Sequence, residues 1–322
     1  MKAQLLPPQL HEYFADSTVT DILVNQSTEV WIERHGILER GNDLQPGQIE
    51  IALERILTPL GRRLDRLSPI VDARLPDGTR VCAVIHPIAV HGTTAAFRLF
   101  RQEVFALNEF CEDSNQQSLH EVLLELSQSQ HNILITGATG SGKTCLVSSL
   151  VSDHSGQSST ISERIIVIED THELLISHPH TVRLEARNAT AEGRGHVSLD
   201  DLLRSALRLR PDRLIVGEVR GLEALTLVQA MNTGHSRCLA TMHANSALDG
   251  LHRLDLLTMQ AAPGWTLQDA RHMVDSAIDV VIHMSRQPYG KRSVTQIAKV
   301  ISSPPAESHP PRLHYIYRHH DS

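Results

Sequence analysis

The chain has 322 residues, of which 41% are apolar and 21% charged, and its formal net charge is −7. This composition excludes a disordered or fibrous protein, and the length predicts two domains of ordinary size. The excess of acidic side chains argues against a constitutive binder of nucleic acid or of anionic membranes, while leaving room for a local basic patch.

The sequence also indicates a cellular compartment. The four cysteines stand far apart with no metal-ligand spacing, which favours free thiols in a reducing cytosol. The first residues lack the continuous apolar stretch of a secretory signal, and no run of about 18 apolar residues occurs. We therefore expect a soluble cytoplasmic protein.

Residues 1–100 are expected to form a small α+β domain. Residues 29–36 are typical of a strand that turns into a second strand at its final glycine. Apolar residues recur every three to four positions over 48–61, which predicts an amphipathic helix. The Asp77-Gly78 pair between two apolar runs predicts a hairpin, and residues 93–100 supply a last strand.

The rest of the chain predicts a second domain, over 119–302, after a polar linker at 101–118. Short apolar runs alternate there with helical patterns, which is typical of a mostly parallel sheet covered on both faces. The expected strands are 132–136, 165–168, 213–216, 238–241 and 280–283, and the expected helices are 143–151, 199–209, 222–232 and 246–258. The serine-rich segment 148–162 is interpreted as a surface loop, and the tail 303–322 as irregular.

A phosphate-binding motif follows the strand 132–136. Gly137-Ala138-Thr139-Gly140-Ser141-Gly142-Lys143-Thr144 matches G-x-x-x-x-G-K-[ST] between a strand and a helix. Glycines let backbone N–H groups turn towards phosphates, and the helix N-terminus adds a favourable dipole. Lys143 is expected to reach the β- and γ-phosphate oxygens, and the Thr144 hydroxyl to ligate Mg²⁺. A chance glycine-rich turn is the alternative, which the flanking strand and helix disfavour.

Such a site also needs a metal-supporting acid and a group that orients the attacking water. Strand 213–216 is followed by Gly217, where most such strands carry Asp, and then by Glu218, which becomes the candidate for polarising water. Glu169, Asp170 and Glu173 follow strand 165–168 and are candidates for the metal, because ligands collect at the carboxyl ends of strands in an open α/β sheet. A helix N-cap pair is the alternative for Glu169 and Asp170.

Arginines and one histidine accompany these acids. Any one arginine is more often a solvated surface charge, but together they could neutralise developing phosphoryl charge, also on a neighbouring subunit. His243 follows another buried strand, so it is either a satisfied core residue or a contact to the γ-phosphate. The remaining histidines, including His178, His180, His319 and His320, are interpreted as surface residues. The arginines are Arg183, Arg187, Arg194, Arg204, Arg208, Arg210, Arg213 and Arg220.

With these motifs the sequence resembles the secretion-superfamily ATPases of type II secretion, type IV pili and type IV conjugation machines, and most of all the CpaF/TadA branch of Tad (Flp) pilus assembly. The resemblance covers about residues 18–300. Its insertion at 187–197 favours the pilus branch over the conjugation branch. The shared motifs are the Walker A run 137–144, the Asp box 168–174, the Walker B run 210–221, the segment 231–235, the His box 240–246, and 20–25, 61–63 and 71–81 near the N-terminus.

The resemblance implies an α/β protein with a RecA-like P-loop core after an α+β (PAS-like) N-terminal domain. It implies a homohexamer that binds ATP and Mg²⁺ between domains and docks on inner-membrane platform proteins. Residues 137–145, ending in Cys145, would bind the nucleotide, Thr144, Glu169 and Asp170 the metal, and Glu218, Lys143, Glu169, His243 and Arg220 would act in catalysis. Arg98 would reach the nucleotide from the N-terminal domain, beside Arg74 and Arg80, and Arg183 and Arg187 would be trans contacts.

Three features depart from the family. Leu99 replaces a second basic residue after Arg98, His86-Pro87 replaces a proline pair, and the long N-terminal extension of the branch is lacking. We expect an ATPase that powers pilus assembly or protein secretion. The alternatives are a conjugative or other type IV secretion ATPase, a RecA-like nucleic-acid translocase and a non-catalytic nucleotide-binding scaffold.

Overall fold

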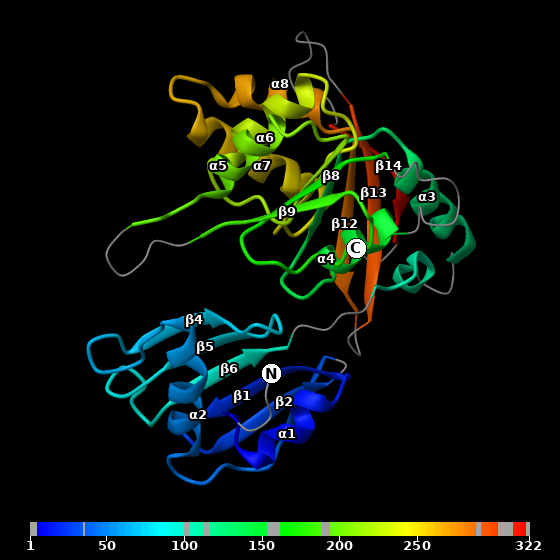
Figure 1. Cartoon of the computed structure of the whole chain (residues 1–322). Coiled ribbons are helices and arrows are strands. Elements are labelled where there is room, and N and C mark those ends of the chain that lie inside the picture. The colour runs from blue at the N-terminus through cyan, green and yellow to red at the C-terminus, as the bar shows by residue number, and fades with distance from the viewer. Residues whose placement is uncertain are drawn as a thin grey trace. The chain divides into compact units, whose positions relative to one another are not determined.

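The structure is a computed structural model that describes residues 5–34, 36–99, 104–111, 116–152, 162–187, 194–287, 291–301 and 312–319. These residues fall into two compact units, one ending at Leu99 and one beginning at Val104 (Figure 1). No helix in the described ranges is long and apolar enough to cross a membrane.

The N-terminal unit is an antiparallel sheet with two helices that share its core. The strand order is β3-β2-β1-β6-β5-β4, so the two hairpin groups join where β1 pairs with β6. The amphipathic helix expected over 48–61 is confirmed, because α2 buries Ile49, Leu53 and Ile56. The elements are α1 (Pro8–Ala15), β1 (Val19–Asn25), β2 (Glu29–Arg34), β3 (Ile37–Arg40), α2 (Gln48–Leu57), η2 (Thr58–Leu60), β4 (Ile70–Arg74), β5 (Arg80–Val84) and β6 (Thr94–Arg98).

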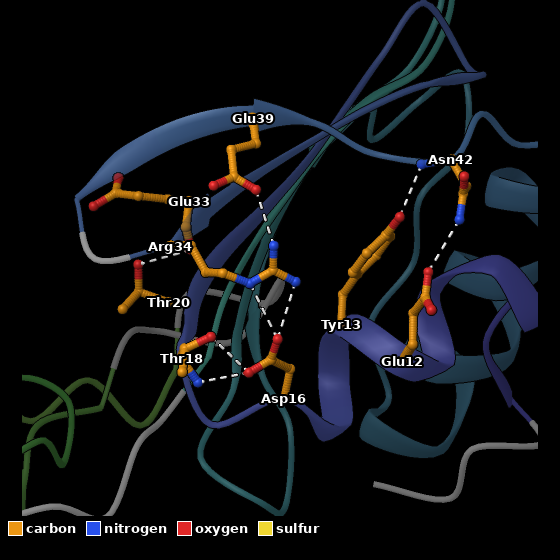
Figure 2. A network of polar contacts seen from close by, with 9 residues as sticks. All are labelled: Glu12, Tyr13, Asp16, Thr18, Thr20, Glu33, Arg34, Glu39 and Asn42. Atoms are coloured by element: carbon orange, nitrogen blue, oxygen red, sulfur yellow. Dashed lines mark hydrogen bonds and ion pairs between the residues drawn. The ribbon is translucent and has the colours of Figure 1, made fainter.

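A polar network holds the junction between α1 and the first strands. Figure 2 shows Asp16 between the start of β1 and Arg34 of β2, and the Arg34 Nε and Nη2 atoms donate to Asp16 Oδ2 at 3.1 and 3.0 Å. The Thr18 hydroxyl and backbone N–H donate to the other Asp16 oxygen at 2.6 and 2.9 Å. These hydrogen bonds from Thr18, followed by those from Arg34, lower the pKa of Asp16 to about 2. The carboxylate therefore stays ionised and ties three segments together.

The second unit contains an eight-stranded sheet with the order β14-β13-β12-β7-β11-β10-β8-β9. The neighbours from β12 to β9 are parallel, whereas β13 and β14 extend the β12 edge antiparallel. The sheet is therefore mostly parallel, as expected, with an antiparallel extension at one edge. The strands are β7 (Ile133–Gly137), β8 (Ile165–Glu169), β9 (Thr181–Glu185), β10 (Arg213–Val216), β11 (Leu239–Met242), β12 (Val280–Arg286), β13 (Arg292–Val300) and β14 (Leu313–Arg318).

Helices cover both faces of this sheet (Figure 1), and alternate strand residues enter two separate cores. Ile166 and Ile168 of β8 pack on the side of α5 to α8, whereas Ile165 and Val167 pack on the side of α3 and α4. Burial of both faces explains the continuous apolar runs. The helices are η3 (Leu107–Phe110), α3 (Gln116–Gln128), α4 (Lys143–Ser152), α5 (Leu199–Leu207), α6 (Glu223–Asn232), α7 (Ala247–Ala261) and α8 (Leu267–Ala277).

The tail 303–322 is not irregular throughout, because its residues Leu313–Arg318 form β14. The preceding Arg312 is 3% exposed. Its Nη1 donates to Asp255 Oδ2 of α7 at 2.6 Å, and its Nε donates to Asp275 Oδ1 of α8 at 2.9 Å. This buried triad, which spans 57 residues of sequence, anchors a strand that composition alone does not predict.

Two other boundaries are corrected. Helix α4 continues to Ser152, so the first five residues of the segment 148–162 are helical. Ser148 and Ser149 are buried and donate to main-chain carbonyls one turn earlier, which allows serine in a packed helix. Helix α3 begins at Gln116, inside the expected linker 101–118. Residues 101–103, 112–115, 153–161, 303–311 and 320–322 of these segments, and with them His320, lie outside the described ranges.

Candidate functional site

The phosphate loop lies between the end of β7 at Gly137 and the start of α4 at Lys143. Its glycines have positive φ angles, 153° at Gly137, 73° at Gly140 and 96° at Gly142. A side chain at Gly137 would also meet Ser141 Oγ at 2.5 Å. The backbone therefore requires glycine here both for conformation and for space.

The loop fits an anion. Ser141 Oγ is buried and has no hydrogen-bond partner among the described atoms, so a donor is available inside the loop. Lys143 Nζ donates to the carbonyl oxygens of Gly137 and Ala138 at 3.0 and 2.9 Å. Those carbonyls hold the ammonium at the loop until phosphate oxygens, which carry full charge, compete for it.

A continuous chain of polar contacts leads from the loop across three further strand ends. Lys143 Nζ lies 3.3 Å from His243 Nδ1, and His243 Nε2 lies 3.5 Å from Glu218 Oε1. Arg220 Nε is 3.5 Å from the same Glu218 oxygen, and its Nη2 is 3.3 Å from Asp170 Oδ2. Five residues proposed from four separate sequence motifs therefore lie together at the carboxyl edge of the sheet.

His243 is neutral in this arrangement. Burial, followed by the charge of Lys143, lowers its pKa below the ordinary value, and Glu218 only partly opposes this shift. Because the Lys143 ammonium faces Nδ1, that nitrogen accepts a hydrogen bond and the ring proton lies on Nε2. Nε2, which then carries the proton, lies 3.5 Å from Glu218 Oε1.

Gly217 stands where most comparable strands carry Asp, and the structure explains the substitution. Its N–H donates to Ile168 O at 2.8 Å, and a Cβ built on Gly217 would lie 3.0 Å from Glu169 Cγ. The Glu169 side chain from β8 thus fills the space that an Asp at 217 would need. The next residue, Glu218, provides the carboxylate instead.

Glu169 does not point its oxygens at the phosphate loop. It is 4% exposed, and its Oε1 accepts hydrogen bonds from the N–H groups of Glu173 and Leu174 at 2.7 and 2.8 Å. Its Oε2 lies 3.1 Å from His172 Nδ1. The N-cap alternative is wrong, since the next regular element after β8 is the strand β9. Glu169 organises the loop that carries the more exposed Asp170.

The turn that carries Glu218 and Arg220 has its own buried acid, which sequence reasoning missed. Glu223 is 6% exposed at the start of α6, and its Oε1 accepts hydrogen bonds from the N–H groups of Arg220 and Gly221 at 2.7 and 2.8 Å. A charge-assisted pair of this kind fixes the turn backbone. An acid three residues after Arg220 was the signal that could have found it.

Arg183 and Arg187 stabilise loops of their own chain. Arg183 donates from its two terminal nitrogens to the carbonyls of Leu174 and Ile176 at 2.9 and 2.7 Å. Arg187 Nε donates to Gly195 O at 2.6 Å. Residues 188–193 of the insertion lie outside the described ranges. The role of these two arginines as trans contacts stays a prediction.

In the N-terminal unit, the three arginines of interest form one row. Arg74 of β4 pairs with Arg80 of β5, which pairs with Arg98 of β6, and Arg98 pairs in turn with Asp21 of β1. Directly opposite residues share a face of the sheet, so the three arginines lie on one face. Leu99 is 8% exposed and packs in the core, so it replaces a basic residue at an inward position.

Three further arginines lie near the site and were missed by sequence reasoning. The charge of Arg253 on α7 contributes to lowering the pKa of His243. Arg286 and Arg292 lie against the phosphate loop from β12 and β13. The signal that could have found the latter pair is a cluster of basic residues just after an apolar strand.

The described residues contain no group of three or more His, Cys, Asp and Glu side chains able to hold a metal ion. A bound phosphate would supply further oxygen ligands to a divalent ion at this site. Two residues are suited to share the coordination of such an ion, the partly exposed Thr144 and the exposed Asp170. The oxygens of Glu169 are less suited, because they already accept hydrogen bonds from their own loop.

The chain is similar to several known proteins. The chain is 35% identical over 314 residues to a putative conjugal transfer protein of Mycobacterium tuberculosis, covering 92% of this chain and 84% of that protein. It is 33% identical over 313 residues to the type IV secretion system protein PtlH of Bordetella pertussis, covering 86% and 88%. Its fold is similar to the X-ray structure of the Legionella pneumophila ATPase DotB, with a TM-score of 0.66, 19% identity and coverage of 91% and 79%. The family profile described as "Type II/IV secretion system protein" matches residues 8–309, so the chain belongs to that family.

Proposed function

We propose that the protein is a hexameric ATPase that hydrolyses ATP to ADP and phosphate and drives a bacterial secretion or pilus machine. The observation that carries this proposal is the unbroken set of contacts from Lys143 through His243 and Glu218 to Arg220 and Asp170. A non-catalytic nucleotide-binding protein requires the phosphate loop and its lysine. It does not require an acid and a histidine in contact beside that lysine.

In the proposed reaction the phosphate loop binds the triphosphate, and the Lys143 ammonium turns from the Gly137 and Ala138 carbonyls to phosphate oxygens. Glu218 accepts a hydrogen bond from the attacking water and aims it at the γ-phosphate. His243, hydrogen-bonded to Lys143 through Nδ1 and facing Glu218 through Nε2, senses the γ-phosphate from the side of Lys143. Arg220 stabilises the negative charge that develops on the transferred group.

Magnesium would be held by Thr144, by phosphate oxygens and by water on Asp170, and when bound it neutralises phosphate charge. In this proposal Glu169 acts indirectly on the ion, because its side chain holds the loop that carries Asp170 and does not itself coordinate the ion.

We further propose that nucleotide turnover in a homohexameric ring does work on inner-membrane platform proteins. The insertion 187–197 supports a machine of the Tad (Flp) pilus type. A conjugative or other type IV secretion machine is the second candidate, because the relatives named above are a putative conjugal transfer protein and a type IV secretion system protein. Arg98, Arg183 and Arg187 are proposed to complete the nucleotide site.

The test is ATP hydrolysis by the purified hexamer with Mg²⁺. Lys143→Ala and Glu218→Gln should each lower the rate by a factor on the order of 10²–10³. Lys299→Ala and Glu121→Gln, the same changes at exposed positions on β13 and α3, are the matched controls and should keep the rate. Unchanged hydrolysis by Lys143→Ala or Glu218→Gln would refute the assigned roles, and no hydrolysis by the wild type would refute the proposed function.

A further inference from the structure

The β12–β13 hairpin brings two arginines to the phosphate loop. Arg286 is the last residue of β12, and Arg292 is the first residue of β13. The two are direct partners in the antiparallel register. Like charges placed directly opposite each other on neighbouring strands repel, and an anion bound between them relieves that repulsion.

Both arginines face the second half of the loop. A Cβ built on Gly140 would lie 3.6 Å from Arg286 Nη1, and a Cβ built on Gly142 would lie 2.8 Å from Arg292 Cδ. Arg292 Nη1 also contacts Cys145 Sγ at 3.4 Å, at the first turn of α4. Gly142 is therefore required as glycine partly to let the Arg292 side chain pass over the loop.

The strand order divides the charges around the loop. Strand β7, which carries the loop, lies between β12 and β11. His243 lies on the β11 side, where it contacts Lys143. Glu218 and Asp170 lie farther along on the same side. On the β12 side are Arg286 and Arg292. The reacting γ-phosphate and its water belong to the first side, because the acid that orients water lies there.

We propose that Arg286 and Arg292 bind the diphosphate portion of the nucleotide, the α- and β-phosphate oxygens that ATP and ADP share. This inference rests on the proposed function of the loop as a nucleotide site. A guanidinium matches two phosphate oxygens at once, and the backbone amides of the loop and of the first turn of α4 cradle the same two phosphates. The pair determines how firmly ADP is held, whereas Glu218 and His243 determine how fast ATP is cleaved.

The experiment measures affinities for ADP, ATP and AMP by isothermal titration calorimetry on the full-length hexamer, alongside steady-state hydrolysis. Arg286→Gln and Arg292→Gln should each weaken ADP and ATP by about tenfold, as expected for loss of a charge-assisted hydrogen bond. The change for AMP, which lacks the β-phosphate, should be smaller. The kcat at saturating ATP should stay within about twofold, since uniform binding of substrate and transition state does not alter it.

Lys291→Gln is the matched control, because it removes a positive charge from the same hairpin. The Lys291 charge acts on the Cys111 thiol, which packs beside η3, and this substitution should leave the ADP affinity unchanged. A second measurement is the rise in Tm that saturating ADP produces, which should shrink in both arginine variants and persist in Lys291→Gln.

Several outcomes would overturn the inference. One such outcome is an unchanged ADP affinity in both arginine variants. Another is an equal loss of ADP affinity in Lys291→Gln, because this would indicate that the overall positive charge of the hairpin, and not contact with the phosphates, determines the affinity. A lower kcat with unchanged ADP affinity would place the arginines at the γ-phosphate. Wild-type protein that binds ADP but hydrolyses no ATP would refute the proposed function and leave the diphosphate site standing, whereas wild-type protein that binds neither nucleotide would refute both.

Discussion

Replacing Arg312 by Met removes the only positive charge from a buried triad in the described part of the second unit. Arg312 is bidentate to Asp255, at 2.6 and 3.0 Å, and its Nε also donates to Asp275 at 2.9 Å. The side chains of Arg312, Asp255 and Asp275 are 2%, 3% and 9% exposed. Breaking such a pair from one side leaves an uncompensated buried charge, so we expect a loss of about 3–5 kcal/mol of unfolding free energy.

The assay is thermal and urea unfolding, with the signal of the second unit followed separately. For a unit of this size the loss corresponds to a Tm decrease on the order of 6–20 °C. Arg318→Met is the control, because Arg318 lies at the exposed end of the same strand, over the Tyr315 ring. It should change stability by less than about 0.5 kcal/mol.

If an uncompensated buried charge causes the loss of stability, two further results are expected. Changing all three residues together, Arg312→Met with Asp255→Leu and Asp275→Leu, should recover most of the lost stability, because no buried charge is then left. Burial already raises the pKa of Asp255 in the wild type, so without Arg312 the carboxyl should take up a proton more readily, and the deficit of Arg312→Met should shrink as pH falls from 7 to 5. A single variant that loses less than about 1 kcal/mol, or a triple variant as unstable as the single one, would refute the reasoning.

Two further predictions concern residues beside the site. His283 is 5% exposed, so the expectation that the remaining histidines are surface residues is wrong for it, because its strand is covered on both faces. Burial lowers the pKa of His283 to about 4 from 6.5, so the unfolded chain binds this proton first and stability should fall as pH drops from about 6.5 to 4, by on the order of 3 kcal/mol. His283→Gln should remove about one proton from that slope in a pH series of urea unfolding, and an unchanged slope contradicts the assignment. Glu223→Ala should lower kcat about tenfold with little change in KM for ATP, because the turn holding Glu218 and Arg220 loosens, and Glu223→Gln should recover part of the rate. An altered KM with normal kcat would show that Glu223 acts on binding instead.

The sequence predicted a large part of this protein because its signals are local. The apolar runs of β7, β8, β10, β11 and β12 follow from burial on both faces, and the phosphate loop follows from glycines whose φ angles are positive. Proximity of the acids at 169–170 and 218 to the loop was also predictable, since parallel strands end at one edge.

Other features depend on residues far apart in the chain. Strand β14 pairs with β13 and follows Arg312, which pairs with acids on α7 and α8, and no periodicity within 303–322 encodes those partners. The same holds for Glu169, whose carboxylate turns back to its own loop, and for Arg183, whose guanidinium meets main-chain carbonyls. A side chain's direction is decided by competing hydrogen-bond partners, which only the folded chain supplies.

By itself, then, the sequence determined which residue types meet at the edge of the sheet, because strand polarity and loop conformation are encoded locally. Only the tertiary structure decided on which side of the phosphate loop each of these charged residues lies. Placing β7 between β12 and β11 puts Arg286 and Arg292 on one side of the loop and His243 with Glu218 on the other. Strand order is a property of packing across the whole sheet, and the separation of charge around the loop follows from it.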